Sequence, residues 1–490
     1  MPVRPQIKLL ATNSAIYGIG NVLSKLSAFF LIPIYTRYLP MKEVGIIALL
    51  EMGELFIITL VPLGLVNAIW RYLPESTKEE KVKILSSAFW GINGIGIITL
   101  LVLMFARDQI SHHLQLGADG PKFILILLCN SFLFVGGQFI LWMLQYEQKP
   151  IKYLMLSLFQ FLGVLILNVL FIVFLDKNIF GVLYSKFIIF LILYFISGSF
   201  VLWRAAVLPS ILLLKKLMKY SLPLVLTGFV MPILTVSDRY FLNLFVSIDE
   251  IGIYSIAYKF GMLINMLLVV PLQRTLIPMI YQSGMDQNNQ KIYRDAMFYY
   301  ALIGCLFLLA MDVLAPSFLQ YFATKDYVSG AAIIPWITLA YFINGFRSFF
   351  RSSLILKDKT AILGWIGVVT IILNIGLNYL LIKELGVAGA VIATVISYLF
   401  VLSCIYFNAQ RIIKIEWKWI RLIKLFAITL ITIYCYHGLF QLGIHSMIFA
   451  VLISLVLFCV SLLITKTIGW REINGIKLIF HKLKMLSEEE

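Results

Sequence analysis

Residues 153–175 read YLMLSLFQFLGVLILNVLFIVFL, and this run indicates the fold class. It holds no charged side chain and is long enough to cross a bilayer as a helix, which takes about 20 mostly apolar residues. Lipid offers no partners to backbone polar groups, so only a helix or a closed barrel satisfies such a segment. We therefore predict a transmembrane helix over this stretch.

Similar apolar runs with few charges fill most of the chain on both sides of this segment, and the connectors between them are short. Together they predict an all-α polytopic membrane protein of about fourteen transmembrane helices. The spans are expected near residues 12–34, 45–69, 84–106, 122–145, 153–175, 180–202, 221–245, 252–280, 296–315, 331–355, 361–382, 386–408, 421–440 and 445–466.

The composition supports this class and excludes others. Of the 490 residues, 61% are hydrophobic and only 13% are charged, whereas soluble domains carry about 25% charged residues. The formal net charge of +16 would suggest nucleic acid as the partner of a soluble protein, but in a membrane protein such an excess marks cytoplasmic loops. No nucleic acid is expected as a partner.

The orientation follows from the basic residues in alternate loops. The loops on the side of both termini hold 26 Lys and Arg, and the opposite loops hold 7. Positively charged loops stay in the cytoplasm. We therefore predict an even number of spans with both termini cytoplasmic.

A short motif occurs twice, six spans apart. Residues 42–46 read KEVGI and open the second span, and residues 249–253 read DEIGI and open the eighth. This repeat predicts two six-helix lobes related by a pseudo-two-fold axis along the membrane normal, with the substrate between them and a helix pair appended. The expected divisions are 1–203 for the N-terminal lobe, 204–220 for a cytoplasmic interfacial linker, 221–410 for the C-terminal lobe, 411–468 for the accessory spans and 469–490 for an amphipathic cytoplasmic tail.

Several cations fall inside predicted spans, where ionisable groups are costly and mark cavities or pathways. Lys25, Arg239, Lys259 and Arg347 are the candidates for a cavity, and Arg351 lies one helical turn beyond Arg347, closer to a cytoplasmic loop. Lys186 and Arg274 lie near span boundaries, where a cation needs no functional explanation.

Two carboxylates are the expected counterparts of these cations. Glu54 lies at a depth similar to Lys25 and is a candidate for an ion pair with it or for proton coupling. Asp238 is expected to pair with Lys259, which leaves Arg239 to face the lumen. Glu51 is expected near the outer boundary, where an exposed acid needs little explanation.

Other polar residues argue for structure rather than catalysis. Asn168, Asn374 and Asn378 are expected to hydrogen-bond between helices, with sugar hydroxyls as the alternative partners. No nucleotide-binding, metal-binding or nucleophile motif lies in a loop, and the five cysteines show no ligand spacing. We expect no enzyme activity, no cofactor and no metal.

Several short stretches resemble the polysaccharide (O-antigen type) flippases of the multidrug/oligosaccharidyl-lipid/polysaccharide exporter superfamily. They occur in the family's order: LIPIYTRYL at 31–39, EVG at 43–45, LGL at 63–65, RY at 71–72, DRY at 238–240 and GIYS at 252–255. Together with the plan of fourteen spans, the resemblance covers nearly the whole chain.

The resemblance implies a carrier that moves undecaprenyl-diphosphate-linked oligosaccharides across the bacterial inner membrane by alternating access, through a cationic central cavity. Its partners would be the lipid-linked oligosaccharide, membrane lipids and a downstream polysaccharide polymerase. Basic side chains suit a lipid diphosphate, since Arg binds it with two donors and Lys acts as a point charge. A cation-coupled multidrug exporter and a flippase for the peptidoglycan precursor lipid II remain open as alternatives.

Overall fold

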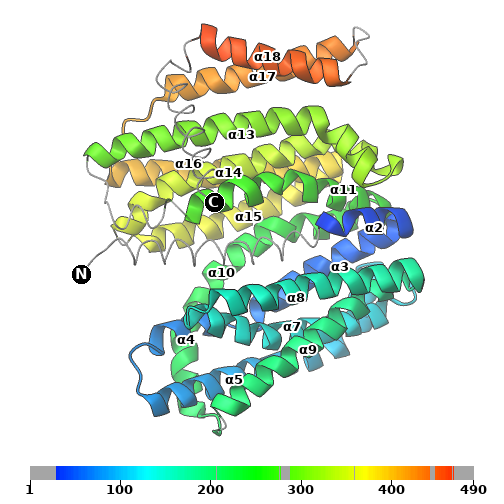
Figure 1. Ribbon diagram of the computed structural model, residues 1–490, viewed down its shortest axis with the longest axis vertical. Coiled ribbons are helices and arrows are strands. Elements are labelled where there is room, and N and C mark those ends of the chain that lie inside the picture. Colours follow the sequence, from blue (N-terminus) through cyan, green and yellow to red (C-terminus); the bar gives the residue numbers. More distant parts are fainter. Residues whose placement is uncertain are drawn as a thin grey trace, which may run out of the picture. The chain divides into compact units, whose positions relative to one another are not determined.

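The computed structural model describes residues 29–205, 207–274, 276, 287–357, 359–441, 447–465 and 467, and every regular element in these ranges is a helix (Figure 1). The helices are α2 (Ile32–Tyr38), α3 (Met41–Leu60), α4 (Leu65–Tyr72), α5 (Lys78–Phe105), α6 (Arg107–His113), α7 (Gly120–Tyr146), α8 (Pro150–Asn168), η1 (Val169–Phe174), α9 (Asn178–Arg204), α10 (Ile211–Phe245), α11 (Ile248–Gly261), η2 (Asn265–Val269), α13 (Gln287–Phe322), η3 (Lys325–Ile333), α14 (Ile334–Leu356), α15 (Thr360–Leu385), α16 (Val387–Ile412), α17 (Trp419–Gln441) and α18 (Met447–Ile464).

The helices agree with the predicted spans. Eleven helical segments of the described residues are long and apolar enough to cross a membrane, and each coincides with one of the fourteen predicted. The predicted seventh span coincides with α10 and the fourteenth with α18. Most of the first predicted span, like the predicted tail at 469–490, lies outside the described residues. An all-helical, multi-pass membrane protein is thus confirmed, and the count of fourteen for the whole chain stays a prediction.

The contacts divide the chain into two compact units. The first unit comprises residues within Met1–Phe260, Leu319–Ile333 and Ala361–Val401, and the second comprises residues within Gly261–Phe318, Ile334–Thr360 and Leu402–Glu490. In the first unit, α7 packs along α9, and α10 contacts α3, α4 and α5. In the second, α17 and α18 pack together as a helix pair. The lobes inferred from the repeated motif stay a prediction.

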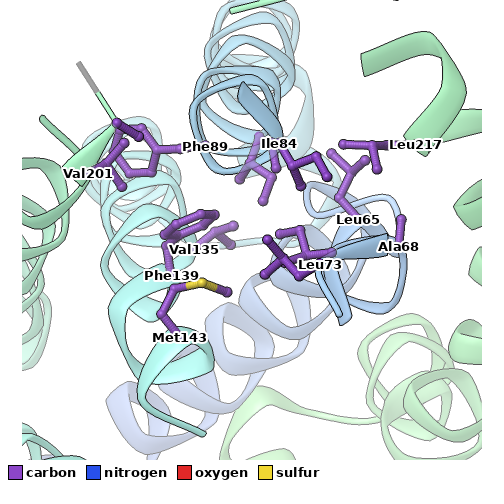
Figure 2. Close-up of a cluster of buried hydrophobic side chains, with 14 of the residues drawn as sticks. Leu65, Ala68, Leu73, Ile84, Phe89, Val135, Phe139, Met143, Val201 and Leu217 are labelled. Carbon is purple, nitrogen blue, oxygen red and sulfur yellow. The ribbon is translucent and has the colours of Figure 1, made fainter. Parts of the chain in front are cut away.

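A buried apolar cluster fixes the helices at one end of the first unit. It gathers side chains from α4, α5, α7, α9 and α10 (Figure 2), among them Leu65, Phe89, Phe139, Val201 and Leu217. Leu217 lies in the segment that we predicted to be an interfacial linker. In the structure this segment is already helical from Ile211 and continues without a break into the predicted seventh span.

The predicted second span is interrupted, which its hydropathy does not reveal. Helix α3 ends at Leu60, and Leu63 and Gly64 both adopt positive φ, +41° and +67°, before α4 begins. Gly64 suits this left-handed conformation because it has no Cβ. A Cβ there would also come within 3.0 Å of the Ser221 carbonyl oxygen at the α10 contact. Non-helical backbone at membrane depth is tolerated where protein covers it.

Candidate functional site: a charge cluster in the first unit

The two copies of the repeated motif meet in the first unit, at the starts of α3 and α11. A Cβ added to Gly45 would lie 2.0 Å from the carbonyl oxygen of Ile248, and one added to Gly252 would lie 2.6 Å from that of Met41. Gly45 therefore faces Ile248, four residues before Gly252, and Gly252 faces Met41, four residues before Gly45. Small residues let helix backbones approach this closely. The contact is reciprocal and sets α3 against α11.

Farther along α3 and α11 from this crossing, the first ion pair joins the same two helices. Lys259 on α11 lies 3.3 Å from the Glu51 carboxylate on α3, and their side chains are 12% and 32% exposed. We predicted Asp238 as the partner of Lys259 and an unremarkable boundary position for Glu51. The structure instead makes Glu51 the carboxylate that Lys259 contacts.

The second ion pair joins α3 to α9. The Lys186 Nζ donates to Glu54 Oε2 at 2.6 Å, and both side chains are largely buried. The sequence interpretation of Lys186 as an ordinary boundary cation missed this contact. Lys25, the predicted partner of Glu54, lies outside the described residues. A cavity of about 10 Å³ beside this pair has room for about one water molecule.

The third ion pair lies within α10 and is the most deeply buried. Arg239 Nη1 lies 3.3 Å from Asp238 Oδ1 and donates to the Thr235 carbonyl at 3.0 Å. The hydroxyl of Tyr254 on α11 donates to the other Asp238 oxygen. The guanidinium also lies over the ring of Tyr258, 4.8 Å from its centroid, a favourable arrangement for a desolvated cation.

These six residues form what we call the charge cluster: Glu51, Glu54, Lys186, Asp238, Arg239 and Lys259. Electrostatic interactions connect the pairs, because Glu51 interacts with Lys186 and Arg239 as well as with Lys259. With all six ionised, three positive charges face three negative ones. Removing charges from water costs several kcal/mol per ion, so their arrangement in pairs is what lets them lie inside a membrane protein.

Buried amide groups hold the surrounding helices together, as predicted for the asparagines. Tyr35 on α2 donates to Asn168 on α8 at 3.1 Å. Ser237 on α10 donates to Asn374 on α15 at 2.9 Å, and Asn378 donates back to the Ser237 oxygen at 3.3 Å. Ser237 precedes Asp238 in the chain, so this network fixes the part of α10 that carries the third ion pair.

The remaining predicted site residues lie elsewhere. Arg347 and Arg351 are one turn apart on α14 in the second unit, and both are half-buried. The structure thus brings Glu54, Asp238, Arg239 and Lys259 together in the first unit and adds Glu51 and Lys186. Within the described ranges, no group of three or more His, Cys, Asp or Glu side chains is arranged to hold a metal ion.

Several solved structures share this arrangement of helices. The lipid II flippase MurJ, in an inward closed conformation, superposes with a TM-score of 0.76 over 94% of this chain and 99% of its own, at 17% identity. An inward-facing multidrug resistance MATE family transporter of the MOP superfamily matches with a TM-score of 0.67 over 79% of this chain and 94% of its own, at 14% identity. The MATE transporter VcmN of Vibrio cholerae matches with a TM-score of 0.59 over 84% of this chain and 98% of its own, at 16% identity. The chain has the fold of the MOP-superfamily transporters.

The family follows from the sequence. The profile of the polysaccharide biosynthesis protein family matches residues 10–284, more than half of the chain. The chain therefore belongs to this family, which confirms the predicted resemblance. A comparison with curated protein sequences finds no match.

Proposed function

We propose that this protein is a flippase that carries undecaprenyl-diphosphate-linked oligosaccharide repeat units across the bacterial inner membrane by alternating access, for surface polysaccharide biosynthesis. The observation that carries the proposal is the family match over residues 10–284. The fold it shares with MurJ over 94% of the chain supports it, since that protein is a lipid II flippase. The partners in this proposal are the lipid-linked oligosaccharide, membrane lipids and a downstream polymerase.

The charge cluster suggests how an anionic lipid would be bound. The substrate-binding residues in this proposal are Lys25, Arg239, Lys259, Arg347 and Arg351. Lys259 is the natural first contact, because its partner Glu51 is the most exposed member of the cluster. A phosphate oxygen would replace the Glu51 carboxylate, so Lys259 would exchange one anion for another without being left uncompensated in low dielectric.

The carboxylates of the cluster would then bias the transport cycle. Once Lys259 binds a phosphate, Glu51 keeps its electrostatic interactions with Lys186 and Arg239. Glu54 and Asp238 stay in their own pairs or take up a coupling ion. A ligand shifts a conformational equilibrium only through different affinities for the two states, and this exchange of partners would supply such a difference.

A deletion strain tests the substrate. We expect it to accumulate polyprenyl-linked oligosaccharide on the inner leaflet and to lose surface polysaccharide, and the full-length chain should restore both. Unchanged surface glycan together with new drug sensitivity would instead support the cation-coupled multidrug exporter. Rescue of cells depleted of their own lipid II flippase would support the peptidoglycan-precursor alternative.

Variants in the restored strain test the proposed contacts. We expect R347A to abolish export at wild-type abundance in the membrane, and the double variant R239A/R347A to abolish export as well. Abundance must be measured, because Arg239 also belongs to a buried ion pair. Normal export by the double variant at wild-type abundance would rule out a role for these two arginines in substrate binding.

The proposed topology has both termini in the cytoplasm. Single cysteines at two exposed positions test it: Glu79, in the first turn of α5 on the expected cytoplasmic side, and Ala118, in the turn before α7 on the expected outer side. In intact cells, a membrane-impermeant maleimide should label A118C and not E79C, with the parental protein as the control for native cysteines. Labelling of E79C and not of A118C would show that the protein has the opposite orientation in the membrane.

A further inference from the structure

A groove of about 630 Å³ lies at the end of the first unit where α4 ends and where α5 and α10 begin. Its lining includes four lysines, Lys83, Lys215, Lys216 and Lys219, and a single carboxylate, Glu80. We call it the basic groove. It lies at the end of the first unit that we propose to be cytoplasmic.

The positive charge of the basic groove is largely uncompensated. Glu80 accepts hydrogen bonds from the Thr77 backbone N–H at 2.9 Å and from its hydroxyl at 3.2 Å, in the capping box that starts α5. Lys216 lies over the ring of Tyr72, 4.9 Å from its centroid. Within the described residues, none of the four lysines forms a salt bridge. An excess of three positive charges therefore faces the groove.

Buried contacts fix the backbone that carries these lysines. Leu217, between Lys216 and Lys219, is fully buried and belongs to the apolar cluster shown in Figure 2. On the preceding segment, Ser86 of α5 donates to the Val207 carbonyl, and the Ser210 N–H donates to the Ser87 hydroxyl at 2.8 Å. The lysines thus project from a helix end held at fixed positions against α5.

Exposed apolar side chains surround the same helix end. Trp203, Leu208, Ile211 and Leu212 are each at least 81% exposed. Large apolar groups beside lysines are typical of segments at a membrane surface, where the apolar groups enter the acyl region and the cations lie among the phosphates.

We propose that the basic groove binds the phosphate headgroup of an anionic phospholipid, with the acyl chains beside Leu208, Ile211 and Leu212. Lysine recognises phosphate as a point charge, and an anionic headgroup supplies the charge that the groove lacks. The bound lipid would hold the start of α10 at the leaflet surface. This inference does not depend on which substrate the protein transports.

Native mass spectrometry of the full-length chain in detergent tests the proposal, with phosphatidylglycerol and phosphatidylcholine of identical acyl chains as probes. Wild type should bind its first phosphatidylglycerol at least tenfold more tightly than phosphatidylcholine. Each lysine near an anionic surface contributes about a factor of five. We therefore expect K215Q/K216Q/K219Q to lose this preference and K215R/K216R/K219R to keep it.

A matched control separates the groove from general surface charge. K152Q/K357Q/K359Q removes three exposed lysines, one at the start of α8 and two between α14 and α15, that are expected on the same side of the membrane but lie outside the groove. This variant should keep the preference. The proposal is overturned if the control loses the preference as much as the groove variant, or if the groove variant keeps it. Displacement of bound phosphatidylglycerol by equimolar undecaprenyl phosphate would also overturn it, by assigning the groove to the polyprenyl lipid.

Discussion

The charge cluster and the basic groove belong to the same unit, yet the cations of the cluster are paired with carboxylates and those of the groove are not. In the cluster each of three cations lies within 3.3 Å of a carboxylate. In the groove four exposed lysines face one carboxylate that a helix cap already uses. The difference follows from burial, because an uncompensated charge costs much in low dielectric and little beside water.

Basic residues therefore have two different roles in this membrane protein. Interior cations are compensated by the protein itself, so an anionic ligand must displace a carboxylate to reach them. Cations at the surface lack such partners and can attract a ligand directly. A count of basic residues alone would therefore exaggerate the positive charge that a substrate meets inside the first unit.

The largest effect is expected from breaking one buried pair. E54A leaves Lys186 largely buried without its carboxylate and should lower the free energy of unfolding by about 3 kcal/mol. Unfolding of the detergent-solubilised protein with SDS measures this change. Because an ion pair can be replaced by apolar groups at little cost, E54L/K186M should recover to within about 1 kcal/mol of wild type. An unchanged stability of E54A would show that the cluster is as tolerant as the groove.

A smaller loss is expected where the repeated motifs cross. G45A places a methyl group 2.0 Å from the Ile248 carbonyl oxygen, and such overpacking costs about 1–3 kcal/mol. G94A is the control, since a Cβ there meets nothing within 4 Å, and alanine in a helix gains up to about 1 kcal/mol over glycine. Equal effects of G45A and G94A on SDS unfolding would contradict the close crossing that positions Glu51 against Lys259.

The third effect concerns the hydrogen bond that supports the third ion pair. Y254F removes the hydroxyl that donates to Asp238 and leaves the ring in place. A hydrogen bond to a charged group contributes about 1.5–3 kcal/mol, and we expect the lower end because the backbone N–H of Arg239 still donates to Asp238. Y379F is a control at a half-exposed tyrosine and should change the unfolding free energy by less than about 0.5 kcal/mol.

The smallest effect on stability is expected in the groove. K215Q/K216Q/K219Q removes three exposed charges that repel one another and should shift the unfolding free energy in lipid-free detergent by less than about 1 kcal/mol in total. A loss as large as that of E54A would mean that these lysines stabilise the fold, and the contrast between the two regions would disappear.

The sequence predicts the helices well because hydropathy reports directly on membrane spans. It does not predict the break in the helix at Leu63 and Gly64, because both flanks are apolar and hydropathy carries no information on backbone dihedral angles. Pro62 and Gly64 are the signals that were available, because each disfavours a continuous helix.

Ion-pair partners are harder to predict, because they depend on how neighbouring helices are rotated. The depth of Lys186 in its span predicts a position near a boundary, but depth does not identify the helix that the side chain faces. For Lys259, the repeated motif was a signal in the sequence that could have identified Glu51 as its partner. Glu51 follows Gly45 by six residues and Lys259 follows Gly252 by seven, so the reciprocal contact of the two glycines brings these side chains together.

The equal number of positive and negative charges in the cluster also has an electrical consequence. Moving one elementary charge across a membrane takes about 2.3 kcal/mol per 100 mV, but six ionised groups that sum to zero and move together take almost none. The voltage across the membrane would then exert no net force on this part of the first unit. E54Q would leave one net positive charge there, so export by that variant should become sensitive to valinomycin-imposed potentials, and an unchanged voltage response would contradict this account.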